Sequence, residues 1–165
     1  MTPSSDEVSV LLARMREEGL TLATAESLTG GALAATITGV AGASSVYRGG
    51  VVAYATEVKA DVLGVPVAVV EQHGVVSQEC AAAMAQGARR LVSADVAVAT
   101  TGVAGPSTQE GHPPGTVFVA VASGQGVTAR RLALRGDRAA VQAATVAEAL
   151  ALLHEILPGE EPRVR

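Results

Sequence analysis

The 165 residues carry a net charge of −4, and 48% of them are hydrophobic. A chain of this length can bury the core of one domain, whereas its acidic balance argues against a duplex nucleic-acid binder, which carries a basic face. One Phe, two Tyr and no Trp also leave few stacking platforms for a single-strand binder.

Helices and strands are predicted to alternate along the first part of the chain. A capped helix begins at Ser5 and Asp6 and ends at Gly19. A short strand over 20–26 follows, and then a small-residue helix over 30–39. The next strand, over 45–55, contains a glycine pair, which indicates a bulge or a close backbone approach.

The middle of the chain continues this alternation. A short helix is predicted to end at Gly64, and a second short helix spans 67–74. Ser77 caps a longer helix with Ala, Met and Leu at helical spacing. A buried strand over 94–102 then leads into a long loop over 103–115.

The last third predicts a hairpin followed by a helix. Strands over 116–123 and 127–136 flank Gly124-Gln125-Gly126, and Asp137 caps a helix that runs to Leu157. These elements predict a single three-layer α/β/α domain, with a mixed, mostly parallel sheet closed by the C-terminal hairpin. The domain is expected to take up residues 1–165, with an ordered core over about 6–157 and a disordered tail.

The composition predicts a cytoplasmic protein without a membrane segment. Cys80 is the only cysteine, so no intrachain disulfide can form, and its helical surroundings predict a buried small residue. No run of about 18 apolar residues is present, and the N-terminus lacks the basic region of a signal peptide. Three scattered His and one Cys give no metal-ligand spacing.

The segment Glu26-Ser27-Leu28-Thr29-Gly30-Gly31 is the first candidate site. A serine between a strand and a helix lies at the carboxyl edge of the sheet, where open α/β folds bind ligands. The amides that follow could bind an oxyanion or an anionic ligand at the helix N-terminus. The alternative is that Ser27 or Thr29 only caps the helix.

Tyr54 and Lys59 form the second candidate. A nucleophilic serine needs a base, and none of the three histidines is well placed to be that base. A lysine can take this role when burial or a nearby cation lowers its pKa, and Tyr54 could pass the proton or hold the lysine. The alternative is a solvated lysine beside a core tyrosine.

The third candidate is the loop Thr-Thr-Gly-Val-Ala-Gly-Pro over 100–106. Its amides could wrap a phosphate or a ribose, although it matches neither the Rossmann nor the Walker glycine pattern. The basic cluster of Arg130, Arg131, Arg135 and Arg138 is large enough to hold a phosphate group and small for a nucleic-acid track.

Six segments occur in this order along the chain: "AESLTGG", "GGVVAYATEVKADVLGV", "GVVSQECAAAMAQGAR", "ADVAVATTGVAGP", "PPGTVFVAVA" and "LRGDRAAVQ". Together they resemble the CinA C-terminal domain family over residues 6–157. The chain looks like the stand-alone form of this family. The enzymatic members are nicotinamide-nucleotide amidohydrolases. The resemblance implies deamidation of nicotinamide mononucleotide to nicotinate mononucleotide and ammonia, by a homo-oligomer that needs no metal or organic cofactor.

The resemblance also implies residue roles. The family's Ser, Tyr and Lys fall on Ser27, Tyr54 and Lys59. The residues and the resemblance together predict a set of groups that could contact the nucleotide. These are Thr29, Gly30, Gly31, Thr56, Thr101, Gly102, Gly105 and Arg138.

The chain departs from the family pattern at two places. Ala55-Thr56 replaces the usual Ser-Asn, so the amide fork of asparagine is lost. Gln142 replaces an arginine and carries no charge for a phosphate. Two other functions stay open: the same serine chemistry on another amide, and a non-catalytic nucleotide-binding or competence-related regulatory module.

Overall fold

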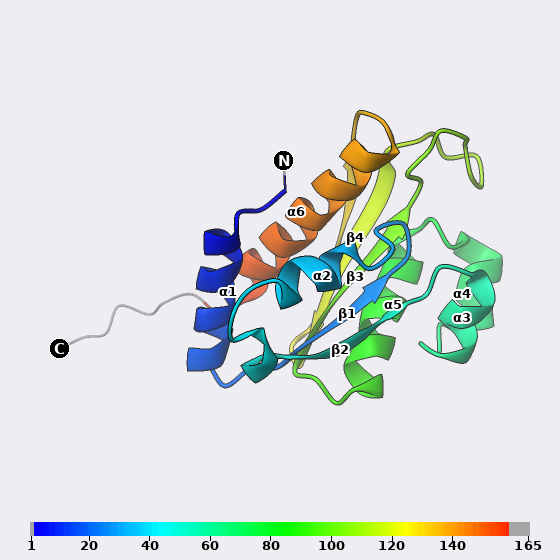
Figure 1. Cartoon of the computed structure of the whole chain (residues 1–165). Coiled ribbons are helices and arrows are strands. Elements are labelled where there is room, and N and C mark those ends of the chain that lie inside the picture. Colours follow the sequence, from blue (N-terminus) through cyan, green and yellow to red (C-terminus); the bar gives the residue numbers. More distant parts are fainter. Residues whose placement is uncertain (1, 159–165) are drawn as a thin grey trace.

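Five strands form one sheet between two layers of helices in the computed structural model, which describes residues 2–158 (Figure 1). The strands follow the order β2-β1-β3-β4-β5 across the sheet. Their bounds are Leu22–Glu26 for β1, Tyr47–Val52 for β2, Val96–Gly102 for β3, Thr116–Ser123 for β4 and Gly126–Ala133 for β5. The prediction for the tail after residue 158 lies outside the described residues.

The pairing confirms the predicted mixed sheet and corrects its closure. β1 pairs in parallel with β2 and β3, whereas β4 pairs antiparallel with β3 and β5. The predicted C-terminal hairpin is present as β4 and β5. It does not close the sheet: β5 pairs with β4 alone, so the hairpin extends one edge and leaves β2 as the other edge.

Helices lie on both faces of the sheet, which confirms the predicted three layers (Figure 1). One face is covered by α1 (Ser5–Glu17), α2 (Ala32–Thr38) and α6 (Arg138–Ile156). On the other face α5 (Gln78–Leu91) packs on the strands, and the short helices α3 (Thr56–Asp61) and α4 (Val67–His73) lie beside α5 (Figure 1). A single 3₁₀ turn, η1 (Ala43–Ser45), precedes β2.

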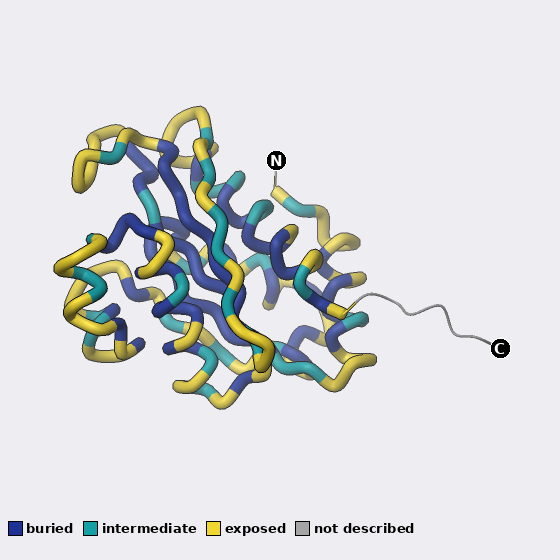
Figure 2. The backbone as a smooth tube through the Cα atoms, turned by 180° about the vertical axis from the view of Figure 1, so that it is seen from behind, coloured by how far each residue is buried: buried dark blue, intermediate teal, exposed yellow. Residues whose placement is uncertain are grey.

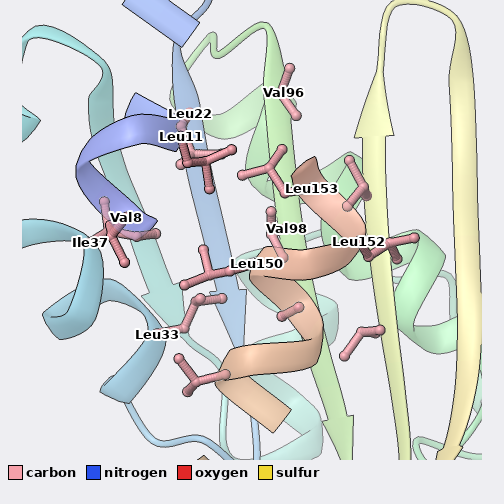
Figure 3. Packing of buried hydrophobic residues seen from close by; sticks show 14 of the residues in the cluster. Val8, Leu11, Leu22, Leu33, Ile37, Val96, Val98, Leu150, Leu152 and Leu153 are labelled. Atoms are coloured by element: carbon pink, nitrogen blue, oxygen red, sulfur yellow. The ribbon is translucent and has the colours of Figure 1, made fainter. Parts of the chain in front are cut away.

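Alternating side chains of the strands divide the core into two clusters. Val96 and Val98 of β3 pack with leucines of α1, α2 and α6 (Figure 3), whereas Ala97 and Ala99 face α5. Successive strand residues point to opposite faces, so one face is rich in leucine and valine and the other in alanine. The inner strands β1, β3 and β4 are buried, whereas the edge strands β2 and β5 alternate between half-buried and exposed residues (Figure 2).

A close backbone contact joins α5 to the chain after α3. At Gly87 of α5, an added Cβ atom would lie 1.9 Å from the carbonyl oxygen of Leu63. Only a glycine fits at this distance, because a real Cβ atom would overlap the oxygen. This contact holds the chain after α3 against α5, and α3 carries Lys59.

α6 is long and apolar enough to cross a membrane by length and composition. In the structure its inner face, which includes Val141, Thr145, Ala149 and Leu152, is buried against the sheet. The contacts with the protein core therefore account for its apolar composition. Its N-terminus is capped as predicted, because the Asp137 side chain accepts a hydrogen bond from the Ala140 amide at 2.9 Å.

β2 ends at Val52, earlier than the predicted residue 55. The amide of Ala53 still donates to the carbonyl oxygen of Glu26 at 2.8 Å, but the chain then turns out of the sheet into α3. The carbonyl groups of Ala53 and Tyr54 consequently point at the buried end of the Lys59 side chain.

Candidate functional site

A cavity of about 340 Å³ lies beside the carboxyl ends of β1 and β3, and Ser27 is part of its lining. Ser27 directly follows β1, and its amide donates to the carbonyl oxygen of Thr100 in β3 at 3.0 Å. The side chain is 9% exposed, so its hydroxyl can meet a molecule in the cavity while the backbone is held by two strands. This placement matches the edge of the sheet that the sequence predicted for Ser27.

Lys59 is fully buried beside Ser27. It is the only lysine of the 165 residues, and it is 1% exposed. Its Nζ atom lies 3.0 Å from the Ser27 Oγ atom, 2.7 Å from the Ala53 carbonyl oxygen and 3.3 Å from the Tyr54 carbonyl oxygen. The reading of Lys59 as a solvated surface lysine is therefore wrong.

Burial lowers the pKa of Lys59 below the usual lysine value, because the charged ammonium loses its water; nearby Cys80 and Glu110 act in the opposite direction. Glu57 and Asp61, on the same helix, are exposed. Neither forms an ion pair or hydrogen bond with Lys59 among the contacts of the described residues. Neither carboxylate therefore offsets the effect of burial on the pKa of Lys59.

Tyr54 lies at the mouth of the cavity, and its side chain is 61% exposed. It contacts Lys59 through its main-chain carbonyl group, and its hydroxyl forms no hydrogen bond with any residue that the structure describes. In the described part of the chain the phenol therefore makes no contact that would hold the lysine, and its predicted part in proton transfer stays a prediction. The reading of Tyr54 as a core residue is wrong.

The loop after β3 forms one wall of the cavity. Thr101, Gly102 and Gly105 all line it, together with Thr56 at the first turn of α3 and Arg138 at the first turn of α6. The Arg138 guanidinium donates to the Gly105 carbonyl oxygen. Lys59 and Arg138 are the basic residues of the lining, and no Asp or Glu lines the cavity within residues 2–158. The lining therefore suits an anionic molecule.

Thr29, Gly30 and Gly31 do not line the cavity, which corrects their predicted role in ligand binding. Their polar groups have partners inside the protein. The Thr29 hydroxyl and the Gly31 amide donate to the Glu26 carboxylate at 2.7 and 3.2 Å, and the Gly30 amide donates to the Ser27 carbonyl oxygen at 3.0 Å. Glu26 thus occupies the helix N-terminus that was expected to receive an anion.

Sequence reasoning missed two contacts that hold the cavity walls. Gln142 donates from Nε2 to the carbonyl oxygen of Leu28 at 2.8 Å, so this residue supports the turn that carries Ser27. Glu110 accepts from the amides of Val75 and Val76 at 2.9 and 3.0 Å, and this ties the loop over 103–115 to the opposite wall. Both contacts join distant segments, and no local pattern signals them.

Cys80 is buried as predicted, with 0% exposure, and burial raises the pKa of its thiol to about 11. At pH 8 only about one thiol in a thousand is then ionised. We expect a thiol reagent to label Cys80 in the native chain at least about 100-fold more slowly than in the denatured chain. A disulfide-exchange assay in buffer and in denaturant measures this ratio; equal rates would show that Cys80 is accessible.

Comparisons with known proteins show similarity to one family. The model of the CinA C-terminal domain matches residues 5–157. A CinA-like protein of Frankia casuarinae is 46% identical over 150 residues, which cover 91% of this chain and 35% of the relative. The chain spans about a third of the length of the curated relatives that it matches.

Solved structures match the chain nearly end to end. A competence-damaged protein (CinA) superfamily protein from Escherichia coli gives a TM-score of 0.90 at 35% identity, over 93% of this chain and 90% of that chain. The competence damage-inducible protein A (ComA) of Klebsiella pneumoniae gives a TM-score of 0.90 at 37% identity, over 96% and 100% of the two chains.

Proposed function

Because the chain belongs to the CinA C-terminal domain family, we propose that it is a serine amidohydrolase that deamidates nicotinamide mononucleotide. The products are nicotinate mononucleotide and ammonia. Ser27 is the nucleophile of this reaction, and Lys59 is its general base. The resemblance in sequence supports the choice of substrate. The contacts of Lys59 support the assignment of the nucleophile and the base.

The observation that carries the proposal is the set of three oxygen atoms around Lys59 Nζ. Two of them are carbonyl oxygens, which can only accept, and the third is the Ser27 hydroxyl, which can donate. A neutral amine has two N–H groups and one lone pair. When the N–H groups bond Ala53 and Tyr54, the lone pair points at the Ser27 hydroxyl, as a base requires.

The reaction then proceeds in two steps through an ester. Lys59 takes the proton of Ser27, Oγ bonds to the carboxamide carbon, and the C–N bond breaks as Lys59 returns the proton to the leaving ammonia. Water attacks the ester carbon with Lys59 again as base, and the Ser27 hydroxyl leaves with the proton. Leu28 lines the cavity, and its amide donates no hydrogen bond within the described residues, so we assign the oxyanion contact to this amide.

Arg138 is proposed to contact the phosphate, because it is the cation at the cavity rim. Replacement of Arg138 by alanine should raise KM for the mononucleotide about 10-fold or more, since a charge-assisted hydrogen bond is lost. KM for the riboside, which has no phosphate, should change less than about threefold. Steady-state ammonia release with both substrates measures the two values.

Arg135→Ala is the matched control, because Arg135 is an exposed arginine that does not line the cavity. It should leave both KM values unchanged. An equal effect of Arg138→Ala on the two substrates would assign Arg138 a structural role through its contact with Gly105.

Mass spectrometry of the product tests the proposed function directly. Incubation with nicotinamide mononucleotide should yield an acid about one mass unit heavier, because –NH₂ becomes –OH. Turnover of free nicotinamide or the riboside in preference to the mononucleotide would assign the same chemistry to another amide. Tight binding of the mononucleotide without turnover would instead assign the chain a binding or regulatory function.

A further inference from the structure

Glu26 holds the turn that carries Ser27 through an unusually complete set of contacts. Its side chain is 1% exposed. Oε1 accepts hydrogen bonds from the Thr29 hydroxyl at 2.7 Å, the Gly31 amide at 3.2 Å and the Leu33 amide at 2.8 Å, while Oε2 accepts from the Ala34 amide at 3.0 Å. All four partners are donors, so an ionised carboxylate satisfies every one of them.

These contacts replace an ordinary helix cap. α2 begins after Gly31, whose φ angle is 102°, and no side chain of the neighbouring turn caps it. The carboxylate reaches the first amides of α2 from the last residue of β1 instead. Glu26 therefore fixes both ends of the turn over 27–31. Its backbone belongs to the sheet, and its carboxylate binds the first amides of the helix.

A chain of hydroxyl groups ties the same carboxylate to β3. The Thr29 hydroxyl has one hydrogen, which it donates to Glu26, so the Thr100 hydroxyl, 2.8 Å away, donates to Thr29. The Thr100 carbonyl oxygen accepts from the Ser27 amide. The Ser27 backbone is thus bonded to residue 100 directly, and the Glu26 carboxylate is linked to residue 100 through the Thr29 hydroxyl.

Glu26 also reaches Lys59 through the main chain. Its carbonyl oxygen accepts from the Ala53 amide at 2.8 Å, and the Ala53 carbonyl oxygen accepts from Lys59 Nζ at 2.7 Å. Glu26 therefore contacts the segment that carries the nucleophile directly, and it is linked to the base through Ala53.

We propose that Glu26 is a positioning residue that sets the orientation of the Ser27 hydroxyl toward Lys59; this inference rests on the proposed function of these two residues. In Glu26→Gln, one oxygen becomes an NH₂ group. If Oε1 keeps its place, the new NH₂ group faces the Ala34 amide. Both groups are donors, so no hydrogen bond can form between them. The turn must shift to relieve this contact, and a misplacement of about 1 Å can cost about 100-fold in rate.

The prediction is that Glu26→Gln lowers kcat about 10- to 100-fold and changes KM less than about threefold. The same loss should appear in the rate at which a fluorophosphonate probe labels Ser27. In that reaction, Oγ bonds to phosphorus and fluoride leaves, while Lys59 takes the proton. Peptide mass spectrometry identifies the labelled serine, and the assay needs no nucleotide.

Two further variants separate positioning from stability. Leu153→Ala removes a core side chain with 0% exposure, far along α6, and destabilises the fold without touching the turn, so its labelling rate should match the wild type. Thr29→Val removes the hydroxyl that bonds Glu26 and should slow labelling about fivefold, whereas Thr29→Ser keeps that hydroxyl and should label at the wild-type rate. The Thr29 pair decides the question if Glu26→Gln does not fold.

Labelling by Glu26→Gln or Thr29→Val at the wild-type rate, under conditions where each variant is folded, would overturn the inference and leave the serine mechanism standing. A similar loss in Leu153→Ala would also overturn it, because instability alone would explain the effect. A wild-type chain that is not labelled at Ser27 would overturn the proposed function and this inference with it.

Discussion

Replacement of Ser27 by alanine is expected to lower kcat for the amidase reaction about 10³-fold or more, because the reaction loses its covalent nucleophile. The Ser27 hydroxyl bonds only Lys59 among the described side chains, so the fold should be retained. Binding of the mononucleotide should also be retained, because Arg138, the proposed phosphate contact, is a different residue of the lining. Ammonia release measures turnover, and calorimetry measures binding.

Ser107→Ala is the matched control for this variant. Ser107 also lines the cavity but lies outside the contact with Lys59, and its loss should change kcat less than about threefold. More than about a tenth of wild-type turnover in Ser27→Ala would rule out the covalent mechanism.

Lys59→Met and Lys59→Arg should both lose about 10²- to 10⁴-fold in kcat, which is the usual contribution of a general base. Methionine keeps the length of the side chain and has no basic nitrogen. Arginine keeps the positive charge but stays protonated in proteins, so it cannot take the Ser27 proton. Substantial activity of the arginine variant would show that position 59 supplies only charge.

The lowered pKa of Lys59 fixes the direction of the pH dependence. Below that pKa the ammonium cannot accept a proton, so kcat/KM should rise with pH and level off once Lys59 is neutral. Burial moves this plateau to a lower pH than a free lysine, with a pKa of about 10.4, would allow.

Because Lys59 is the only lysine, isotope-labelled lysine gives a single side-chain signal that can be titrated by NMR without assignment. The midpoint of that titration should agree with the inflection of kcat/KM in the free enzyme. A signal that titrates with the midpoint of free lysine would contradict the proposed base.

The layers of the fold and the meeting of Ser27 with Lys59 could be predicted from the sequence. The alternation of periodic helices and apolar strands predicts the three layers, and the strand over 20–26 places Ser27 at the ligand-binding edge. The family resemblance then selects Lys59. It cannot indicate that Tyr54 contributes a carbonyl group instead of its phenol, because that depends on where β2 leaves the sheet.

The role of Glu26 could not be predicted, because familiar capping patterns involve a side chain and an amide two or three residues later. Here the carboxylate reaches amides five, seven and eight residues further on. That reach requires two consecutive left-handed glycines, Gly30 and Gly31. The Gln142–Leu28 contact spans 114 residues, and only the packing of α6 on the sheet brings these residues together.

The position of Tyr54 also means that intrinsic tyrosine fluorescence can report ligand binding. With no Trp and only two Tyr, nearly all intrinsic emission comes from the phenols. Tyr47 is partly enclosed and hydrogen-bonded to Thr24 at 2.7 Å, whereas Tyr54 stands exposed at the cavity mouth. A ligand that enters the cavity changes the surroundings of one fluorophore and leaves the other as an internal reference, so occupancy can be followed on the unlabelled protein.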